Sequence, residues 1–151
     1  MQVLIVEDNA FNAFCMARLF ETICSNTEVS VAQNSLEAIT NIDANAPDLV
    51  VLDGNLQALD GDQCNGPALA DYIWRRYPRM PIVAWTDHEG MIKKFKDVYA
   101  THLKPFNEVT AWPKSIDYTK LYQAITTLSL KYDLDLFCHN PDAYHFQRLY
   151  A

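Results

Sequence analysis

The sequence predicts an α/β fold in which a parallel sheet is covered by helices on both faces. Two observations support this prediction. Short apolar segments and segments with apolar residues at helical spacing alternate five times along the chain. The central apolar segment, Leu49–Leu52, contains no polar residue, which is typical of a strand that is buried on both faces.

The composition indicates one globular domain and excludes several classes of protein. The chain has 151 residues, of which 50% are hydrophobic and 21% are charged. The formal net charge of −7 argues against direct nucleic-acid binding, because a phosphate backbone would be repelled. The N-terminus, MQVLIVEDNA, lacks the basic lead-in of a secretory signal, so we expect a cytoplasmic protein without membrane insertion.

The amino-terminal part of the chain is predicted to contain three strands and two helices. β-Branched apolar runs indicate the strands, and apolar residues at helical spacing indicate the helices. Asn9 is a candidate N-cap for the first helix, and Pro47 marks the end of the second. In chain order, we expect the strand Val3–Val6, the helix Phe11–Cys24, the strand Thr27–Ala32, a helix that begins at Ser35, and the strand Leu49–Leu52.

The remainder of the chain is predicted to contain three helices and two strands. We expect the helix Pro67–Tyr77, the strand Pro81–Trp85, a helix with Met91, Ile92 and Phe95 on one face, the strand Tyr99–Leu103, and a last helix capped by Ser115. The segments Leu56–Gly66 and Asn107–Lys114 are longer than the connections that such a fold needs. The tail, residues 133–151, is rich in aromatic residues.

The carboxyl ends of the predicted strands carry residues that suit a metal site. The first strand is followed by Glu7 and Asp8, the third by Asp53, the fourth by Thr86, and the fifth by Lys104. Such ends converge at one edge of an open parallel sheet, where binding sites form. Three carboxylates at this edge need either raised pKa values or a cation, and their oxygen atoms suit Mg²⁺.

These residue types also suit phosphoryl transfer. An aspartate beside Mg²⁺ can attack phosphorus and form an aspartyl phosphate. The metal, a lysine and a hydroxyl group would then hold the phosphoryl oxygens, which carry the charge of the transition state. Asp53, Lys104 and Thr86 fit these three roles.

The combination of four segments is more specific for a protein family than any one segment is alone. These segments are VLIVEDN, LVVLDGNLQALDG, VAWTD and HLKPF. Through them, residues 1–132 resemble the receiver domains of two-component response regulators, and residues 133–151 form a tail. The resemblance implies a flavodoxin-like, doubly wound parallel sheet of five strands, in the order 2-1-3-4-5, flanked by five helices. It also implies signalling through a downstream protein target, with at most weak catalysis of the domain's own phosphorylation and dephosphorylation.

The resemblance implies a role for each candidate site residue. Asp53 would accept a phosphoryl group from a sensor histidine kinase or a histidine phosphotransfer protein. Glu7, Asp8 and Asp53, with the main-chain carbonyl of Asn55, would hold Mg²⁺. Thr86 would move toward the phosphoryl group.

Lys104 would pair with the phosphoryl group, and the resemblance implies a cis peptide bond between Lys104 and Pro105. The chain departs from the family pattern at several positions, and two of these departures, Asp87 and Thr101, concern the site and its switching. Asp87 follows Thr86, where a small residue is usual, and places another acid near the site. Thr101 stands three residues before Lys104, where receivers commonly carry a switching aromatic residue, which puts aromatic gating of the output face in question.

Two other functions fit parts of the sequence. A receiver-like interaction module that is never phosphorylated fits the departures at Asp87 and Thr101. A phosphatase resembling the haloacid dehalogenases is suggested by the segment LDGNL. Such enzymes need a second acid two residues from the nucleophile, but Val51 and Asn55 occupy those positions, which argues against this phosphatase.

Overall fold

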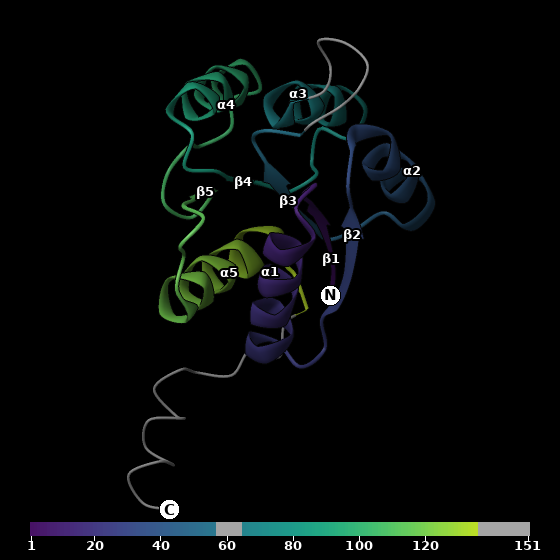
Figure 1. Ribbon diagram of the computed structural model, residues 1–151, viewed down its shortest axis with the longest axis vertical. Coiled ribbons are helices and arrows are strands. Elements are labelled where there is room, and N and C mark those ends of the chain that lie inside the picture. Colours follow the sequence, from purple (N-terminus) through teal and green to yellow (C-terminus); the bar gives the residue numbers. More distant parts are fainter. Residues whose placement is uncertain (57–64, 136–151) are drawn as a thin grey trace, which may run out of the picture.

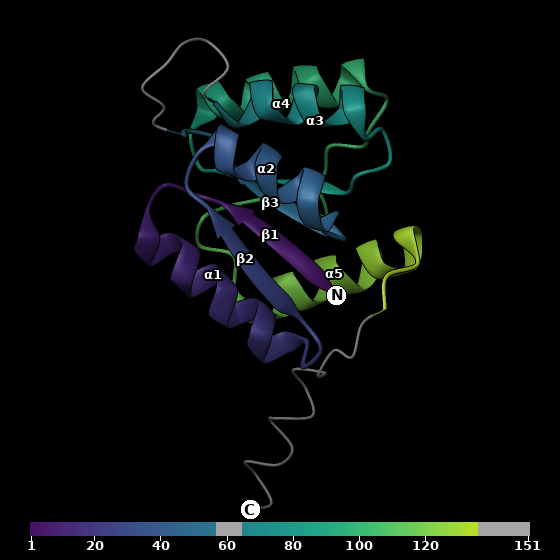
Figure 2. The ribbon, with the colours of Figure 1, turned by 90° about the vertical axis from the view of Figure 1, so that its right-hand side faces the viewer.

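Five short strands form one parallel sheet in the order β2-β1-β3-β4-β5. The computed structural model describes residues 1–56 and 65–135. Helices α2, α3 and α4 cover one face of the sheet, and α1 and α5 cover the other (Figures 1 and 2). The predicted flavodoxin-like fold, with its strand order and five helices, is therefore confirmed.

Strands and helices alternate along the whole described chain. The strands are β1 (Gln2–Val6), β2 (Glu28–Ala32), β3 (Leu49–Asp53), β4 (Ile82–Trp85) and β5 (Ala111–Trp112). The helices are α1 (Ala10–Ile23), α2 (Ser35–Asn45), α3 (Gly66–Arg76), α4 (Glu89–Thr101) and α5 (Tyr118–Tyr132). None of the helices in the described ranges is long and apolar enough to cross a bilayer. Most of the loop Leu56–Gly66 and of the tail 133–151 lies outside the described residues.

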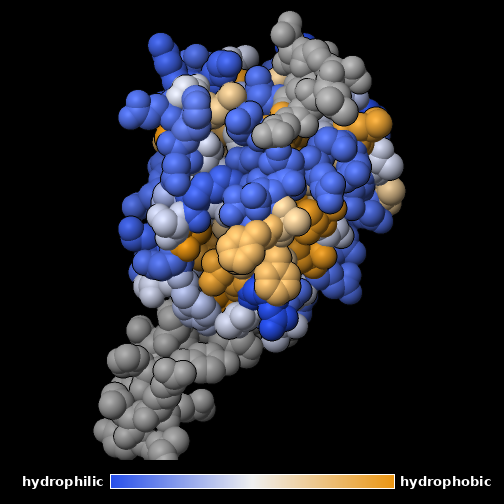
Figure 3. Space-filling view, viewed as in Figure 1, coloured by the Kyte–Doolittle hydropathy of each residue, from blue (hydrophilic) through white to orange (hydrophobic). Residues whose placement is uncertain are grey.

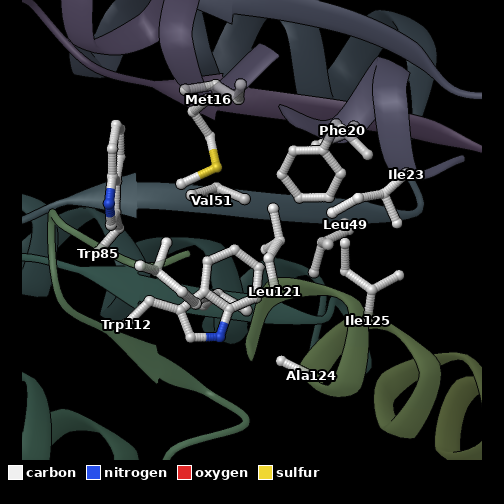
Figure 4. Close-up of a cluster of buried hydrophobic side chains, with 14 of the residues drawn as sticks. Met16, Phe20, Ile23, Leu49, Val51, Trp85, Trp112, Leu121, Ala124 and Ile125 are labelled. Atoms are coloured by element: carbon white, nitrogen blue, oxygen red, sulfur yellow. The ribbon is translucent and has the colours of Figure 1, made fainter. Parts of the chain in front are cut away.

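Two apolar cores, one on each face of the sheet, explain the uninterrupted apolar sequence of β3. Successive side chains of a strand point to opposite faces. Leu49 and Val51 belong to the core against α1 and α5, and Val50 and Leu52 belong to the core against α2, α3 and α4. Figure 4 shows the first of these cores, in which side chains of α1, α5 and the sheet interdigitate. β3 is thus the central strand of the fold, and Asp53 is its last residue.

Side-chain caps define the starts of the helices. Asn9 caps α1 as predicted, because its side chain accepts a hydrogen bond from the backbone of Asn12 at 3.0 Å. The predicted cap of the last helix is wrong. Asp117 caps α5 by accepting from the backbone of Lys120 at 2.9 Å, whereas Ser115 lies in the turn that precedes this cap.

The predicted strand Tyr99–Leu103 is also wrong, because α4 continues to Thr101 and a turn follows it. Tyr99 follows Phe95 by one helical turn, and both side chains are buried in the core beneath α4. The fifth strand is instead Ala111–Trp112, inside the segment that was expected to be a loop. It pairs with β4 in parallel.

The end of α4 explains the sequence around Lys104. Leu103 adopts a left-handed conformation with a φ of 55°. Its backbone N–H donates to the carbonyl of Ala100 at 3.1 Å, and that of Lys104 donates to the carbonyl of Tyr99 at 2.8 Å. These two bonds form a Schellman motif, which terminates helices and is often followed by proline. The predicted cis bond before Pro105 is wrong as well, since residues 1–56 and 65–135 contain no cis peptide bond.

Replacing Tyr99 with phenylalanine is expected to lower the free energy of unfolding by about 1 kcal/mol. The Tyr99 hydroxyl is buried, 2.7 Å from the carbonyl oxygen of Ile82 and 3.2 Å from that of Thr110, and burial raises the pKa of Tyr99. Chemical denaturation would measure the loss. Tyr72→Phe is the control, because the Tyr72 side chain is partly exposed on α3. Equal stability of Tyr99→Phe and the parent would contradict a stabilising role for this hydroxyl.

Candidate functional site

Three carboxylates meet at the carboxyl edge of the sheet. β1 and β3 are neighbours with Val6 opposite Leu52, so the residues at their carboxyl ends lie side by side. One carboxylate oxygen from each of Glu7, Asp8 and Asp53 lies within 4.8 Å of the other two. The structure therefore brings together the three acids that the sequence had placed at different strand ends.

The acid cluster is largely buried, and its electrostatics follow from this burial. Glu7 is 2% exposed and Asp53 is 6% exposed. Burial raises the pKa of Glu7, and the negative charge of Asp53 adds to this effect. Hydrogen bonds from the Lys114 ammonium and from the backbone N–H of Asn9, at 3.0 Å, oppose it.

Lys114, rather than Lys104, provides the positive charge at this cluster. Its Nζ lies 3.0 Å from Oδ1 of Asp53 and donates a hydrogen bond to Oε2 of Glu7. Trp112, the last residue of β5, pairs with Trp85 of β4, and its carbonyl accepts from the backbone of Thr86 at 3.1 Å. The next residues along the chain therefore emerge at the carboxyl edge of the sheet, which brings Lys114 to Asp53.

The prediction that Lys104 lies beside Asp53 is wrong. Lys104 follows α4, whose carboxyl end lies near the amino ends of the strands, because the helix runs antiparallel to them. Lys104 Nζ donates to the carbonyl of Pro78, which precedes β4, at 2.5 Å, and lies 5.6 Å from the ring centroid of Trp74. Lys114 thus lies at the carboxyl ends of the strands, and Lys104 lies near their amino ends.

The Thr86 hydroxyl lies beside the loop that follows Asp53. Thr86 is 8% exposed, and its Oγ1 accepts from the backbone of His88 at 3.1 Å. A β-carbon added at Gly54 would lie 3.0 Å from this Oγ1, so the loop passes close to the hydroxyl. Asn55 is the next residue of the loop and is exposed. That its main-chain carbonyl binds the metal stays a prediction.

The departures from the family pattern at Asp87 and Thr101 have structural explanations. Asp87 Oδ1 accepts from the backbone N–H of Lys114 at 3.0 Å, so this acid anchors the segment that carries the lysine. Thr101 is the last residue of α4, and its hydroxyl donates to the carbonyl of Asp97 at 2.9 Å. Three residues before Lys114 stands Ala111, which has no aromatic ring.

The donor atoms at the site fit a hard divalent cation. Mg²⁺ prefers oxygen ligands and is usually held by one or two carboxylates together with water and phosphoryl oxygens. The three acids supply only oxygen donors, and one oxygen of each lies within 4.8 Å of the other two, close enough to share one ion. The site therefore satisfies the chemical requirements of a magnesium centre.

Comparisons with known proteins agree with the fold. Residues 3–110 match the response regulator receiver domain family, a range that includes the three acids and Thr86 and ends before Lys114. A relative from Vibrio cholerae, protein-glutamate methylesterase/protein-glutamine glutaminase 3, is 27% identical over 99 residues. The match covers 66% of this chain and 26% of the relative, so the chain spans about a quarter of that relative's length.

Two solved structures show the same fold. The receiver domain of NtrX from Brucella abortus has a TM-score of 0.67 and 22% identity, over 88% of this chain and 99% of that domain. A CheY-like receiver domain protein from Methanospirillum hungatei has a TM-score of 0.71 and 16% identity, over 87% of this chain and 95% of that protein. Since the family match also spans most of the chain, the chain belongs to the response regulator receiver domains of two-component signalling.

Proposed function

We propose that this receiver domain accepts a phosphoryl group on Asp53 in a Mg²⁺-dependent reaction and then signals through protein contacts. One observation carries the proposal. The Asp53 carboxylate lies within 4.8 Å of carboxylate oxygens of Glu7 and Asp8, and the Lys114 ammonium, 3.0 Å from Asp53, also contacts Glu7. This arrangement offers a nucleophile, a set of metal ligands and a cation for the phosphoryl oxygens.

Glu7, Asp8 and Asp53, together with the main-chain carbonyl of Asn55, would hold Mg²⁺. When bound, the ion supplies positive charge that neutralises the phosphoryl oxygens as the transition state forms. The residues of the chain orient the nucleophile. Because Asp53 is the last residue of a strand buried on both faces, its backbone is held rigidly at the edge of the sheet.

In the proposed reaction, a carboxylate oxygen of Asp53 forms a bond to the phosphorus of a phosphohistidine. The bond between phosphorus and the imidazole nitrogen breaks, and the imidazole keeps the electron pair. The Lys114 ammonium pairs with the phosphoryl oxygens, and the Thr86 hydroxyl donates to one of them. Lys114 takes the role that the sequence had suggested for Lys104.

The phosphoryl donor is proposed to be a sensor histidine kinase or a histidine phosphotransfer protein in the cytoplasm. α1 begins directly after the acids, and it carries two exposed aromatic side chains, Phe11 at 73% and Phe14 at 63% exposure. Figure 3 shows apolar residues gathered on this face, over the region where α1 lies in Figure 1. An apolar surface beside the site suits docking of a protein donor.

We infer that the phosphorylated unit spans residues 1–132, because α5, the last helix within the described ranges 1–56 and 65–135, ends at Tyr132. The aromatic-rich segment 133–151 is proposed to be a tail outside this unit. The downstream target is proposed to be a protein, because the acidic net charge of −7 disfavours nucleic acid.

Intact-mass measurement after incubation with a small-molecule phosphodonor tests the proposal. The parent protein is expected to gain the mass of one phosphoryl group with Mg²⁺ and none when the metal is chelated. Asp53→Asn is the control and is expected to gain nothing. A gain that persists in Asp53→Asn would refute the assignment of the site. A parent that binds Mg²⁺ but takes no phosphoryl group from any donor would favour the unphosphorylated interaction module.

A further inference from the structure

An indole ring lies against the lysine of the proposed site. Lys114 Nζ is 3.7 Å from the ring centroid of Trp85. Trp85 is the last residue of β4 and stands opposite Asp53 in the pairing of β3 with β4. The ring and the nucleophile therefore belong to neighbouring strand ends, and the ammonium group contacts both.

The burial of Trp85 indicates that the face of its ring has a role beyond packing. Trp85 is 3% exposed and lies at one end of the apolar core against α1 and α5, near Met16 and Val51 (Figure 4). Its Nε1 is buried and has no hydrogen-bond partner among the residues that the structure describes. A buried N–H without a partner is destabilising, and a phenyl ring would fill apolar space without it. Packing alone therefore does not explain the indole, whereas the contact of its face with a cation does, since indole is the strongest of the aromatic partners.

Lys114 is anchored by Asp87 at its backbone and by Glu7 and Asp53 at its ammonium group, and the indole face adds a contact at the tip of a long side chain. Lys114 follows a strand of only two residues, and its flexible side chain has four carbons and many rotamers. Its ammonium group must neutralise Asp53 and Glu7 before the reaction and pair with phosphoryl oxygens afterwards. Attraction to the face of a ring tolerates small lateral shifts of the cation better than a directional hydrogen bond does.

We propose that Trp85 is a positioning residue of the phosphoryl site, whose indole face holds the Lys114 ammonium against Asp53. The effect on phosphorylation rests on the function proposed above, while the contact itself can be tested without phosphorylation. The chain also contains a matched pair for comparison. Lys104 lies 5.6 Å from the ring centroid of Trp74 at the opposite edge of the sheet, and Trp74 Nε1 donates to the carbonyl of Met80 at 2.8 Å.

The first experiment compares phosphorylation rates of the parent with those of Trp85→Leu, Trp85→Phe and Trp74→Phe, using a small-molecule phosphodonor and Mg²⁺. Trp85→Leu is expected to react about tenfold more slowly, and Trp85→Phe about two- to threefold more slowly, because a phenyl ring binds cations less strongly. Trp74→Phe is expected to react at the parent rate. Chemical denaturation of the same variants would show Trp85→Phe to be at least as stable as the parent, because the unpaired N–H is gone.

A purely structural role predicts a different pattern, in which rate and stability fall together in Trp85→Phe. That outcome would overturn the proposal, as would a parent-like rate in Trp85→Leu. Because Trp85→Leu removes a large core side chain, its circular dichroism spectrum must match that of the parent. If that variant does not fold, Trp85→Phe decides between the two roles.

The second experiment detects the contact directly in the unphosphorylated protein. The ε-methylene proton resonances of lysines are recorded by NMR, and that of Lys114 is assigned by its loss in Lys114→Met. A ring current from Trp85 is expected to shift this resonance upfield in the parent, and Trp85→Leu or Trp85→Phe is expected to alter the shift. Trp74→Phe should leave it unchanged. An unshifted Lys114 resonance in the parent would overturn the proposal.

The two experiments separate the failure of this inference from failure of the proposed function. A parent that shows the upfield shift but takes no phosphoryl group would refute the proposed function and, with it, the positioning role. A parent that is phosphorylated on Asp53, together with Trp85 variants that react at the parent rate, would refute only the role of Trp85.

Discussion

Replacing Lys114 with methionine is expected to slow phosphorylation of Asp53 by about 100-fold or more, the usual effect of removing one group that stabilises transition-state charge. Lys114 Nζ lies 3.0 Å from Oδ1 of Asp53, and methionine keeps much of the side-chain volume without the charge. The rate would be followed by intact-mass measurement at saturating Mg²⁺.

Lys104→Met is the matched control, because it removes the same charge from a lysine that lies near the amino ends of the strands. That lysine contacts the carbonyl of Pro78 and the ring of Trp74, far from any acid of the cluster. We expect Lys104→Met to react at the parent rate. The opposite pattern, in which Lys104→Met is slow and Lys114→Met is normal, would show that the lysine of the site is the one that the sequence had suggested.

Replacing Gly66 with alanine is expected to lower the free energy of unfolding by about 3 kcal/mol, at the upper end of the usual cost of overpacking. A β-carbon at Gly66 would lie 2.0 Å from the carbonyl oxygen of Asp53 and 2.8 Å from Cζ of Phe95. The first contact is with backbone and cannot be relieved by a change of rotamer. The start of α3 would therefore have to move away from the end of β3.

Chemical denaturation would measure this loss, and Gly90→Ala is its control. Gly90 lies in the first turn of α4, where an added β-carbon would approach the ring of the capping residue His88, with Cε1 at 3.0 Å and Nδ1 at 3.2 Å, and this side chain can shift where backbone cannot. Alanine favours helix over glycine by up to about 1 kcal/mol, so this variant is expected to match or slightly exceed the stability of the parent. Equal stability of Gly66→Ala and Gly90→Ala would contradict the close approach of α3 to β3.

Most of the fold could be predicted because its signals are local. The strands β1, β3 and β4 are apolar runs of four or five residues, and their predicted and observed ranges agree to within one residue at each end. The helix starts at Asn9 and Pro67 follow from a side-chain cap and from a proline in the first turn. The acid cluster then follows from topology, since parallel strands bring their carboxyl ends to one edge of the sheet.

The errors arose where the local signals were misleading or too short. α4 ends at Thr101, and the left-handed position that follows is occupied by Leu103, where glycine is the usual signal, so Pro105 was the remaining sign of a helix end. The spacing of Phe95 and Tyr99 by one helical turn was the available evidence that α4 continues. β5 has only two residues, which is too few to show any alternation, and it depends on its backbone bonds to β4.

The amino-acid pattern was enough to predict the parallel sheet between helices, the buried strand that ends at Asp53, and the acids that face it. It did not determine which lysine reaches them, because Lys104 and Lys114 both stand beside a proline near an apolar segment. The pairing of β5 with β4 settles this, and it is a contact between segments that are distant in the sequence, so no local pattern could indicate it. That pairing sends Lys114 to the carboxyl edge and against Trp85, while the end of α4 leaves Lys104 at the opposite edge.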